Sequence, residues 1–474
     1  MLDFSKYGMA ERAFRFFSQL SEIPHGSSNT ERIAEYLFNF AKERGLYAKR
    51  DGANNVIIRK CATRGYEDRP TVILQGHSDM VAEKTPDSKR DLLTEGLSLY
   101  IDGDFLRARE TTLGGDDGIA LAYALAILDS DDIEHPEIEA VFTSDEEIGL
   151  LGAAALDCSE LRGKILINID SDEEGIFTVG CAGGVRADIT LPLKRETLSH
   201  PVYSIGISGL LGGHSGIEID KGRANAIKLL GEALVRLGDA ARLVSMRGGN
   251  MDNAIPRDAS AVICSPLSEK EISELLSELR EENLGAEPEM CVGVVREEGL
   301  FSALTEESHK ALVSIIAENP SGVIAMSRDI PGLVETSLNL GIVRVSRERA
   351  EITYSFRSSL EAAKDALVSS VRAVAKRYGA DFETRGAYPA WEYRQSSHLR
   401  DTMCRVYREM YGKDAKVITI HAGLECGIFS NKIEGLDCVS IGPDNFDIHT
   451  TEEHLSLSSS ARVFDFLLKL LCEI

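Results

Sequence analysis

The chain has 474 residues, of which 43% are hydrophobic and 27% are charged, and its formal net charge is −24. This length exceeds what one hydrophobic core usually serves, so we expect two domains. The negative charge repels phosphate backbones and anionic lipids, and no apolar run reaches the roughly 18 residues of a membrane span. We therefore expect neither nucleic acid nor a membrane as a partner.

The N-terminus and the cysteines both favour a cytoplasmic protein. The first twenty residues mix acids and bases with apolar side chains and lack the uninterrupted apolar core of a secretory signal. Nine cysteines are spread along the chain without a CxxC pair, which predicts reduced thiols rather than a disulfide framework or a thiolate metal site.

The first part of the chain alternates helices with strands. Residues 27–45 combine capping residues, helical apolar spacing and a closing Gly45, which predict a helix. Apolar runs predict strands at 54–60, 71–77, 138–144 and 164–170, with helices at 117–130 and 152–158. This alternation is typical of an α/β domain with a mostly parallel sheet covered by helices.

The pattern changes near residue 187, where a second domain is predicted to begin. Its strands alternate apolar and polar residues, as expected for an antiparallel sheet with one wet face. They are predicted at 202–209, 259–265, 289–295, 339–345 and 350–356, with helices at 225–238, 269–283, 306–319 and 364–379. The first pattern then returns and ends in a helix at 458–474. We expect one domain made of residues 1–187 and 396–474, with residues 188–395 inserted as an α+β domain.

Acidic and histidine side chains follow the predicted strands where those strands end. The residues are His77 and Asp79, Glu146 and Glu147, Asp170, the helix-start pair Asp116 and Asp117, and His449 in the loop after strand 436–443. In open α/β sheets, function collects at the carboxyl ends of the strands, so these groups are expected to converge on one crevice.

Each motif alone has an ordinary explanation. An HxD pair is usually chance or a turn, Asp116 and Asp117 could cap a helix, and the acidic residues near 146 and 170 could be solvated. The joint pattern changes this, because five separate chain segments supply imidazole or carboxylate ligands that suit zinc, manganese or cobalt. Two histidines and three carboxylates exceed the roughly three ligands of one catalytic zinc. The pattern therefore predicts two metals and a metal-activated water, and hence a hydrolase.

The order HSD, GGDDG, DEE, NIDSDEE, GGHSG and FDIHTTEEH resembles the dinuclear-metal peptidases over nearly the whole chain. TLGGDDGIA, HAGLECGIF and FDIHTTEEH are most similar to the aminoacyl-histidine dipeptidase branch. The resemblance implies a homodimeric cytoplasmic dipeptidase that cleaves unblocked dipeptides such as Xaa-His and uses its inserted domain as a lid. The alternatives are a deacylase of N-acyl amino acids, a tripeptide aminopeptidase, or a binding protein without turnover. The intact Glu146 and the complete set of five ligand candidates argue against the last.

The resemblance also implies a role for each residue. The ligands of two divalent ions, zinc first and cobalt or manganese otherwise, would be His77, Asp116 as the bridge, Glu147, Asp170 and His449. Glu146 would be the general base, and Asp79 would hydrogen-bond the second nitrogen of His77.

Three further residues are expected to bind substrate: His214 across a dimer interface at the developing oxyanion, Arg357 at the terminal carboxylate, and Glu425. Alone, His214 would be read as a loop histidine and Arg357 as a surface charge. The chain has GDD where ADN is commoner in the branch, so Asp117 adds a negative charge beside the expected metals.

Overall fold

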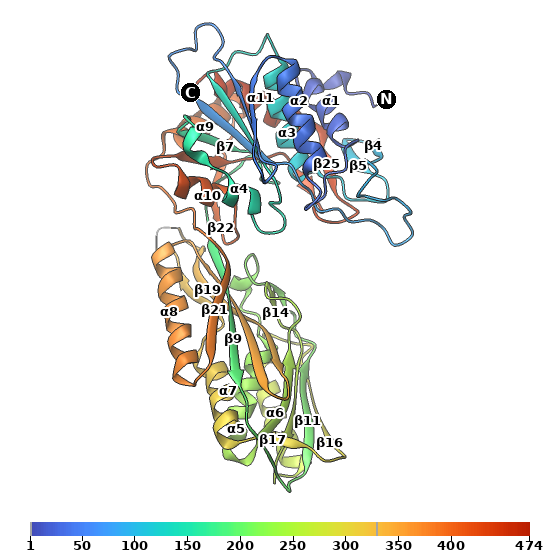
Figure 1. The fold of residues 1–474 in the computed structure, drawn as a ribbon, viewed down its shortest axis with the longest axis vertical. Coiled ribbons are helices and arrows are strands. Elements are labelled where there is room, and N and C mark those ends of the chain that lie inside the picture. Colours follow the sequence, from blue (N-terminus) through green and yellow to red (C-terminus); the bar gives the residue numbers. More distant parts are fainter. Residues whose placement is uncertain (1, 329) are drawn as a thin grey trace. The chain divides into compact units, whose positions relative to one another are not determined.

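The computed structural model describes residues 2–328 and 330–474, and the chain folds into two compact units (Figure 1). The first unit comprises the residues up to 181 together with 393–419 and 424–474, and the second comprises 182–392 and 420–423. The expected boundaries at 187/188 and 395/396 thus differ by a few residues. The short return of 420–423 to the second unit was not anticipated.

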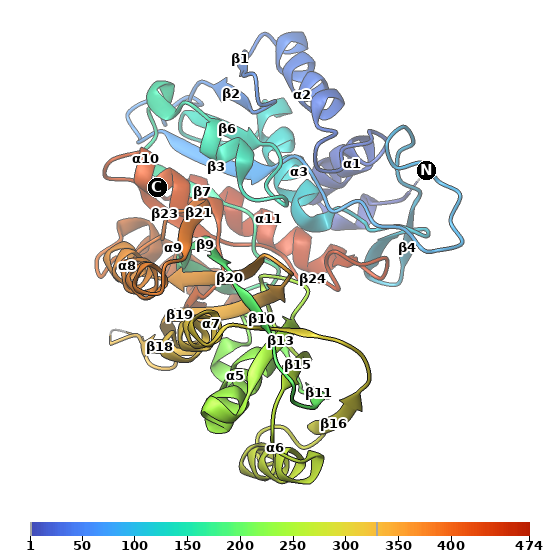
Figure 2. The same ribbon diagram turned by 60° about the horizontal axis from the view of Figure 1, so that its bottom comes forward.

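The first unit is built on an eight-stranded sheet. In sheet order the strands are β1 (Tyr47–Arg50), β2 (Val56–Lys60), β6 (Ile138–Thr143), β3 (Val72–His77), β7 (Ile165–Asn168), β23 (Asp437–Ser440), β8 (Ile176–Cys181) and β22 (Lys416–Ile420). The four strands β6, β3, β7 and β23 run parallel and lie side by side (Figure 2), whereas β1, β2 and β8 pair antiparallel. The α/β class is confirmed, with parallel pairing concentrated at the centre.

Helices cover both faces of this sheet. Val72 and Leu74 of β3 belong to the hydrophobic core that includes α3 (Gly115–Asp129), whose residues 118–128 are all buried. The alternate residue Gln75 faces the other way and contacts α10 (Glu425–Lys432). The remaining α-helices of this unit are α1 (Ala10–Leu20), α2 (Glu31–Glu43), α4 (Leu151–Ala155), α9 (His398–Tyr411) and α11 (Leu457–Leu471).

A smaller sheet in the same unit holds the hairpin that carries His449. Its four strands, in sheet order, are β24 (Asn445–Phe446), β25 (His454–Ser456), β5 (Phe105–Ala108) and β4 (Leu99–Asp102). The rings of Phe446 and His454 stack with their centroids 5.1 Å apart, which joins the two strands of the hairpin. Two 3-10 helices complete the unit, η1 (Ser5–Tyr7) and η2 (Cys158–Glu160).

The second unit is built on a nine-stranded antiparallel sheet, as the alternating pattern predicted. Its main order is β16 (Cys291–Glu297), β11 (Val202–Ser208), β15 (Ala259–Cys264), β13 (Arg242–Gly248), β19 (Val334–Val345), β20 (Arg349–Ser358), β9 (Gly183–Pro192) and β21 (Asp381–Tyr388), with β18 (Gly322–Met326) also paired to β19. Short pairs are β10 (Arg195–Thr197) with β17 (Ser302–Leu304), and β12 (Gly213–His214) with β14 (Ala254–Ile255).

Four α-helices complete the hydrophobic core of the second unit. They are α5 (Ala226–Leu237), α6 (Glu269–Asn283), α7 (Glu306–Glu318) and α8 (Glu361–Arg377). The unit also contains the 3-10 helices η3 (Ile219–Lys221) and η4 (Gly238–Ala240). The sequence specifies where two of them begin, because Asn225 caps α5 and Ser268 forms a capping box with Glu271 at the start of α6.

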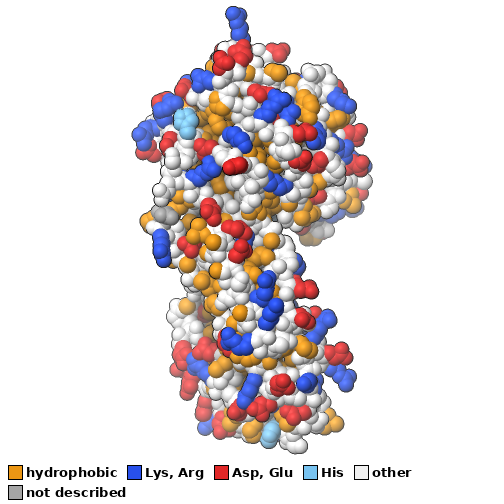
Figure 3. All heavy atoms as spheres, turned by 60° about the vertical axis from the view of Figure 1, so that its left-hand side comes forward, with side chains coloured by type: hydrophobic (Ala, Val, Ile, Leu, Met, Phe, Trp, Pro, Cys, Tyr) orange, Lys and Arg blue, Asp and Glu red, His pale blue; other side chains and the backbone are white. Residues whose placement is uncertain are grey.

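The surface charges, the helices and the cysteines can be compared with what the composition predicted. Acidic and basic side chains are interspersed on the face drawn in Figure 3. Within the described residues, no helix is both long enough and apolar enough to cross a membrane. The nine cysteines all lie within the described residues, and none of them forms a disulfide.

Candidate active site

The predicted ligands of the first unit lie at neighbouring strand ends. His77 is the last residue of β3, Glu146 and Glu147 follow β6, and Asp170 follows β7. Because β6, β3 and β7 are adjacent and parallel, their carboxyl ends meet at one edge of the sheet. Asp116 joins them from the start of α3, and His449 joins them from the hairpin between β24 and β25.

Asp116 lies at the centre of the cluster and contacts both histidines. Its Oδ1 is 2.9 Å from Nε2 of His77, and its Oδ2 is 3.1 Å from Nε2 of His449. Nε2 of His77 is also 3.7 Å from Oδ1 of Asp170, and Nε2 of His449 is 3.0 Å from Oε1 of Glu147. The five ligand candidates therefore form two groups of three that share Asp116.

These two groups have the spacing that divalent cations need. Each offers three ligand atoms that lie within 4.8 Å of one another. A tetrahedral zinc with bonds of about 2.0–2.2 Å holds its ligand atoms roughly 3.3 Å apart. In addition, no described residue gives a hydrogen bond to the buried Oδ2 of Asp170, so this oxygen is free to act as a ligand. The donor set of imidazole and carboxylate fits the expected metals.

The charges of the cluster perturb its histidines and acids. Hydrogen bonds that His449 donates to Asp116 and Glu147 raise the pKa of His449 to about 10. Burial opposes the protonation of His77, but Asp116 and Asp79 still raise its pKa well above the usual value. Burial likewise acts against ionisation of Asp116, yet the two imidazoles hold its pKa below the usual range. The carboxylates of the cluster thus favour positive charge at both histidines.

Glu146 lies beside the ligand groups and is not needed to complete either of them. One of its carboxylate oxygens is within 4.8 Å of ligand atoms of His77 and Glu147. Burial raises the pKa of Glu146 to about 8, with His77 acting against this rise and Glu425 and Glu147 adding to it. A carboxylate with a raised pKa next to the expected metals has the properties of a general base.

The contacts of Asp79 differ from the expected ones. Nδ1 of His77 hydrogen-bonds the main-chain oxygen of Asp79 at 2.9 Å, whereas the Asp79 carboxylate is 3.6 Å from that nitrogen. The carboxylate instead accepts the main-chain N–H of Glu146 at 2.9 Å and the Ser27 hydroxyl at 2.7 Å. Main-chain N–H groups in the turn after β6 compete successfully for the carboxylate. Asp79 thus connects the His77 strand end to the turn that carries Glu146.

Glu453 and Asp117 are site residues whose roles the sequence did not indicate. The buried carboxylate of Glu453 accepts the main-chain N–H groups of Leu113 at 2.7 Å, Gly114 at 2.9 Å and Gly115 at 2.8 Å. It therefore ties the Asp116 segment to the His449 hairpin. Asp117 is also buried and accepts the main-chain N–H of His77 at 3.1 Å. From the sequence, Asp117 was expected only as a helix cap or as an added negative charge beside the metals, and no role was expected for Glu453.

His214 and Arg357 belong to the second unit and lie next to each other. A Cβ atom on Gly216 would be 3.0 Å from Cε1 of His214 and 3.2 Å from Cζ of Arg357. Nδ1 of His214 accepts the main-chain N–H groups of Gly216 and Ile217 at 3.2 and 3.1 Å. Burial and then Arg357 lower the pKa of His214, which favours the neutral ring. Because Nδ1 accepts these two N–H groups, the neutral ring carries its proton on Nε2. His214 is thus a hydrogen-bond donor beside a guanidinium group.

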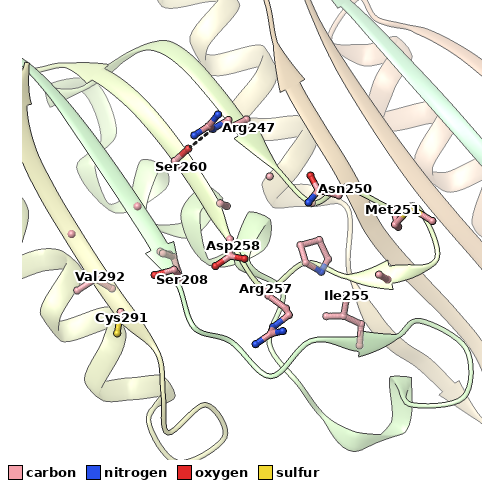
Figure 4. Close-up of a pocket in the computed structure, with 18 of the residues that line it drawn as sticks. Ser208, Arg247, Asn250, Met251, Ile255, Arg257, Asp258, Ser260, Cys291 and Val292 are labelled. Atoms are coloured by element: carbon pink, nitrogen blue, oxygen red, sulfur yellow. Dashed lines mark hydrogen bonds between the residues drawn. The ribbon is translucent and has the colours of Figure 1, made fainter. Parts of the chain in front are cut away.

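Glu425 does not have the accessibility expected of a substrate contact. Its side chain is fully buried in the first unit, where it contacts Gln75 and Thr143. A pocket of the second unit has a volume of about 850 Å³ and is lined by residues such as Arg247 and Ser260 (Figure 4). Its lining includes none of the predicted site residues.

Comparisons with known proteins agree with this geometry. A family model described as peptidase family M20/M25/M40 matches residues 73–473. The cytosol non-specific dipeptidase of Escherichia coli (strain K12) is 37% identical over 467 residues, which are 97% of this chain and 96% of the relative.

Solved structures resemble the chain over nearly its whole length. The crystal structure of aminoacylhistidine dipeptidase from Vibrio alginolyticus has a TM-score of 0.90 at 34% identity and covers 98% of this chain and 96% of its own. The aminopeptidase PepT of Bacillus cereus, with a TM-score of 0.58 at 18% identity over 98% and 99% of the two chains, shares the fold alone. The resemblance inferred from the motifs is confirmed. The family match and the 37% identity show that the chain belongs to peptidase family M20/M25/M40.

Proposed function

We propose that this protein is a cytoplasmic metal-dependent dipeptidase that hydrolyses unblocked dipeptides, Xaa-His among them. The observation that carries the proposal is Asp116, whose two oxygens contact His77 and His449 and so join two ligand groups beside Glu146. The similarity to the Escherichia coli cytosol non-specific dipeptidase and to the Vibrio alginolyticus aminoacylhistidine dipeptidase supports the substrate class.

The ligand groups would hold one cation between His77, Asp116 and Asp170 and a second between Asp116, Glu147 and His449. Zinc is the proposed metal, with cobalt or manganese as substitutes, because histidine and carboxylate donors suit all three. When bound, such ions polarise the scissile carbonyl and lower the pKa of a water molecule.

Glu146 performs the proton transfers of the reaction. Its carboxylate takes a proton from the attacking water and returns it to the nitrogen of the leaving amine. The hydrogen bond from the Glu146 N–H to Asp79 fixes the turn from which this side chain extends. Asp79 is therefore a positioning residue in the proposed mechanism.

The second unit would supply the groups that recognise the peptide. The Nε2–H of His214 donates to the oxyanion that forms on the scissile carbonyl, and Arg357 pairs with the terminal carboxylate. Tyr388 orients Arg357, since Nη1 of Arg357 donates to the Tyr388 hydroxyl at 3.1 Å. From the resemblance we infer that His214 acts in the site of a second subunit, and we therefore propose a homodimer.

A substrate panel tests the proposal. The metal-loaded protein should release free amino acids from Xaa-His dipeptides, lose this activity with a chelator and recover it with zinc. N-acetyl amino acids and tripeptides are the matched comparison. Turnover of either class without dipeptide cleavage would replace the proposal with the deacylase or tripeptide aminopeptidase alternative. The mass of the protein in solution tests the dimer.

A further inference from the structure

Glu425 is a fully buried carboxylate at the start of α10. Its Oε2 accepts hydrogen bonds from Nε2 of Gln75 at 2.5 Å and from Oγ1 of Thr143 at 2.6 Å. Among the described residues, its Oε1 has no hydrogen-bond partner. The side chain therefore has an incomplete set of partners and no basic residue among its hydrogen-bonding contacts.

The partners of Glu425 belong to the strands that carry the metal ligands. Gln75 lies two residues before His77 on the same face of β3, and Thr143 ends β6 three residues before Glu146. Oε1 of Gln75 also accepts a hydrogen bond at 2.6 Å from Asn168, the residue that ends β7 two positions before Asp170. Glu425 thus joins a polar layer directly behind three strand ends of the site.

A charge at this position does not stabilise the fold by itself. A buried carboxylate without a full set of partners costs more free energy than a neutral side chain of the same size. Burial raises the pKa of Glu425 to about 7, which reflects this cost. Because the hydrogen-bonding partners of Glu425 lie two residues before His77 and three residues before Glu146, its charge acts on the site across a short, poorly solvated distance.

We propose that Glu425 is a positioning residue of the metal site, whose buried negative charge favours the binding of cations and whose hydrogen bonds fix Gln75 and Thr143 behind the ligands. The proposal rests on the metal site of the proposed function. It replaces the expected direct contact between Glu425 and the substrate, and it explains why a carboxylate occupies a position that an amide would fill at lower cost.

The test is the substitution Glu425→Gln, with Glu139→Gln as the matched control. Glu139 is a fully buried carboxylate near the start of β6, on the same face as Thr143, and it pairs with Arg59 at 2.9 Å. Metal dissociation constants are measured by competition with a chelator, and thermal unfolding is measured on the metal-free proteins.

The two variants should separate metal affinity from stability. We expect E425Q to weaken metal binding about 10- to 100-fold, the usual effect of losing a group behind the ligands, with an unchanged or raised Tm. E139Q should lower the Tm and keep the metal dissociation constant within about two-fold of wild type, because it breaks an ion pair away from the strand ends. Dissociation constants for E425Q within two-fold of wild type, or an equal loss in E139Q, would overturn the proposal.

A second variant covers the case in which E425Q does not fold. Thr143→Val keeps the shape of residue 143 and removes one hydrogen bond to Glu425, so it should weaken metal binding several-fold in the same assay. Wild-type metal affinity in T143V would then count against the proposal. A wild-type protein that binds metal and cleaves no dipeptide would refute the proposed function alone, because the affinity comparison remains decisive for Glu425.

Discussion

Glu453 gives the sharpest prediction about how the fold holds the site. Its carboxylate accepts three short hydrogen bonds from the consecutive N–H groups of Leu113, Gly114 and Gly115, directly before Asp116. Glu453→Gln keeps the shape of the side chain and removes its charge. The carboxylate uses both of its oxygens as acceptors, whereas the glutamine amide has only one oxygen. The NH2 group at the other position then faces a main-chain N–H and leaves it without an acceptor.

The size of the effect follows from these bonds. One buried N–H left without an acceptor costs about 1–3 kcal/mol, and the loss of charge weakens the two remaining bonds by a further ~1 kcal/mol. Relief of the buried charge offsets part of this cost, since burial raises the pKa of Glu453. We therefore expect the segment to be destabilised by about 1–3 kcal/mol, which corresponds to roughly 5- to 160-fold more frequent local opening.

Hydrogen–deuterium exchange of the peptide that contains residues 113–116 measures this opening in the metal-free protein. The matched control is Glu452→Gln, because Glu452 is the exposed neighbour of Glu453 and its side chain is outside the cluster. E453Q should exchange faster in this peptide and bind metal more weakly, while E452Q behaves as wild type. Exchange in E453Q within two-fold of wild type would refute the reasoning.

Three further predictions concern catalysis, protonation and stability. Glu146→Gln should lower kcat by about 10²- to 10⁴-fold with unchanged metal content, and retention of a tenth of wild-type activity would rule out the base assignment. Because Asp116 and Glu147 raise the pKa of His449 to about 10, metal binding near neutral pH must release its proton. Metal affinity should therefore rise with pH up to about 10. Calorimetry in buffers of different ionisation enthalpy should detect the released protons. A metal affinity that does not depend on pH would contradict this expectation. The ammonium group of Lys228 donates hydrogen bonds to the carbonyls of Ile316 at 2.5 Å and Asn319 at 2.6 Å, at the end of α7. Lys228→Met removes these bonds, so it should lower the free energy of unfolding of the second unit by about 1–3 kcal/mol. Thermal unfolding measures this loss, and metal affinity should be unchanged.

The convergence of the candidate ligands could be predicted from the sequence because it follows a rule of topology. Parallel strands end at one edge of a sheet, so His77, Glu147 and Asp170 could be grouped before any geometry was known. The contacts of Asp79 could not be predicted, because they depend on which main-chain N–H groups the turn after β6 presents. Glu453 was missed for the same reason, since its binding site is made of main-chain groups that the conformation of the Gly114 segment aligns.

For the fold too, sequence patterns predicted the sheets but not the surroundings of individual side chains. Alternating apolar residues predicted the antiparallel sheet of the second unit, and buried apolar runs predicted the parallel centre of the first. The burial of Glu425 was not predictable, because HAGLECGIF crosses the boundary between the units: residues 420–423 belong to the second and Glu425 begins a helix of the first. A local pattern contains no information on which side of such a boundary a side chain lies.

The central claim is that Asp116 joins two metal positions in one site. The most direct measurement is the metal content per chain together with an anomalous-scattering map of the zinc-loaded crystal. The account predicts two ions per chain, about 3.5–4 Å apart, with one oxygen of Asp116 on each. A single ion, or ions bound away from His77 and His449, would contradict it.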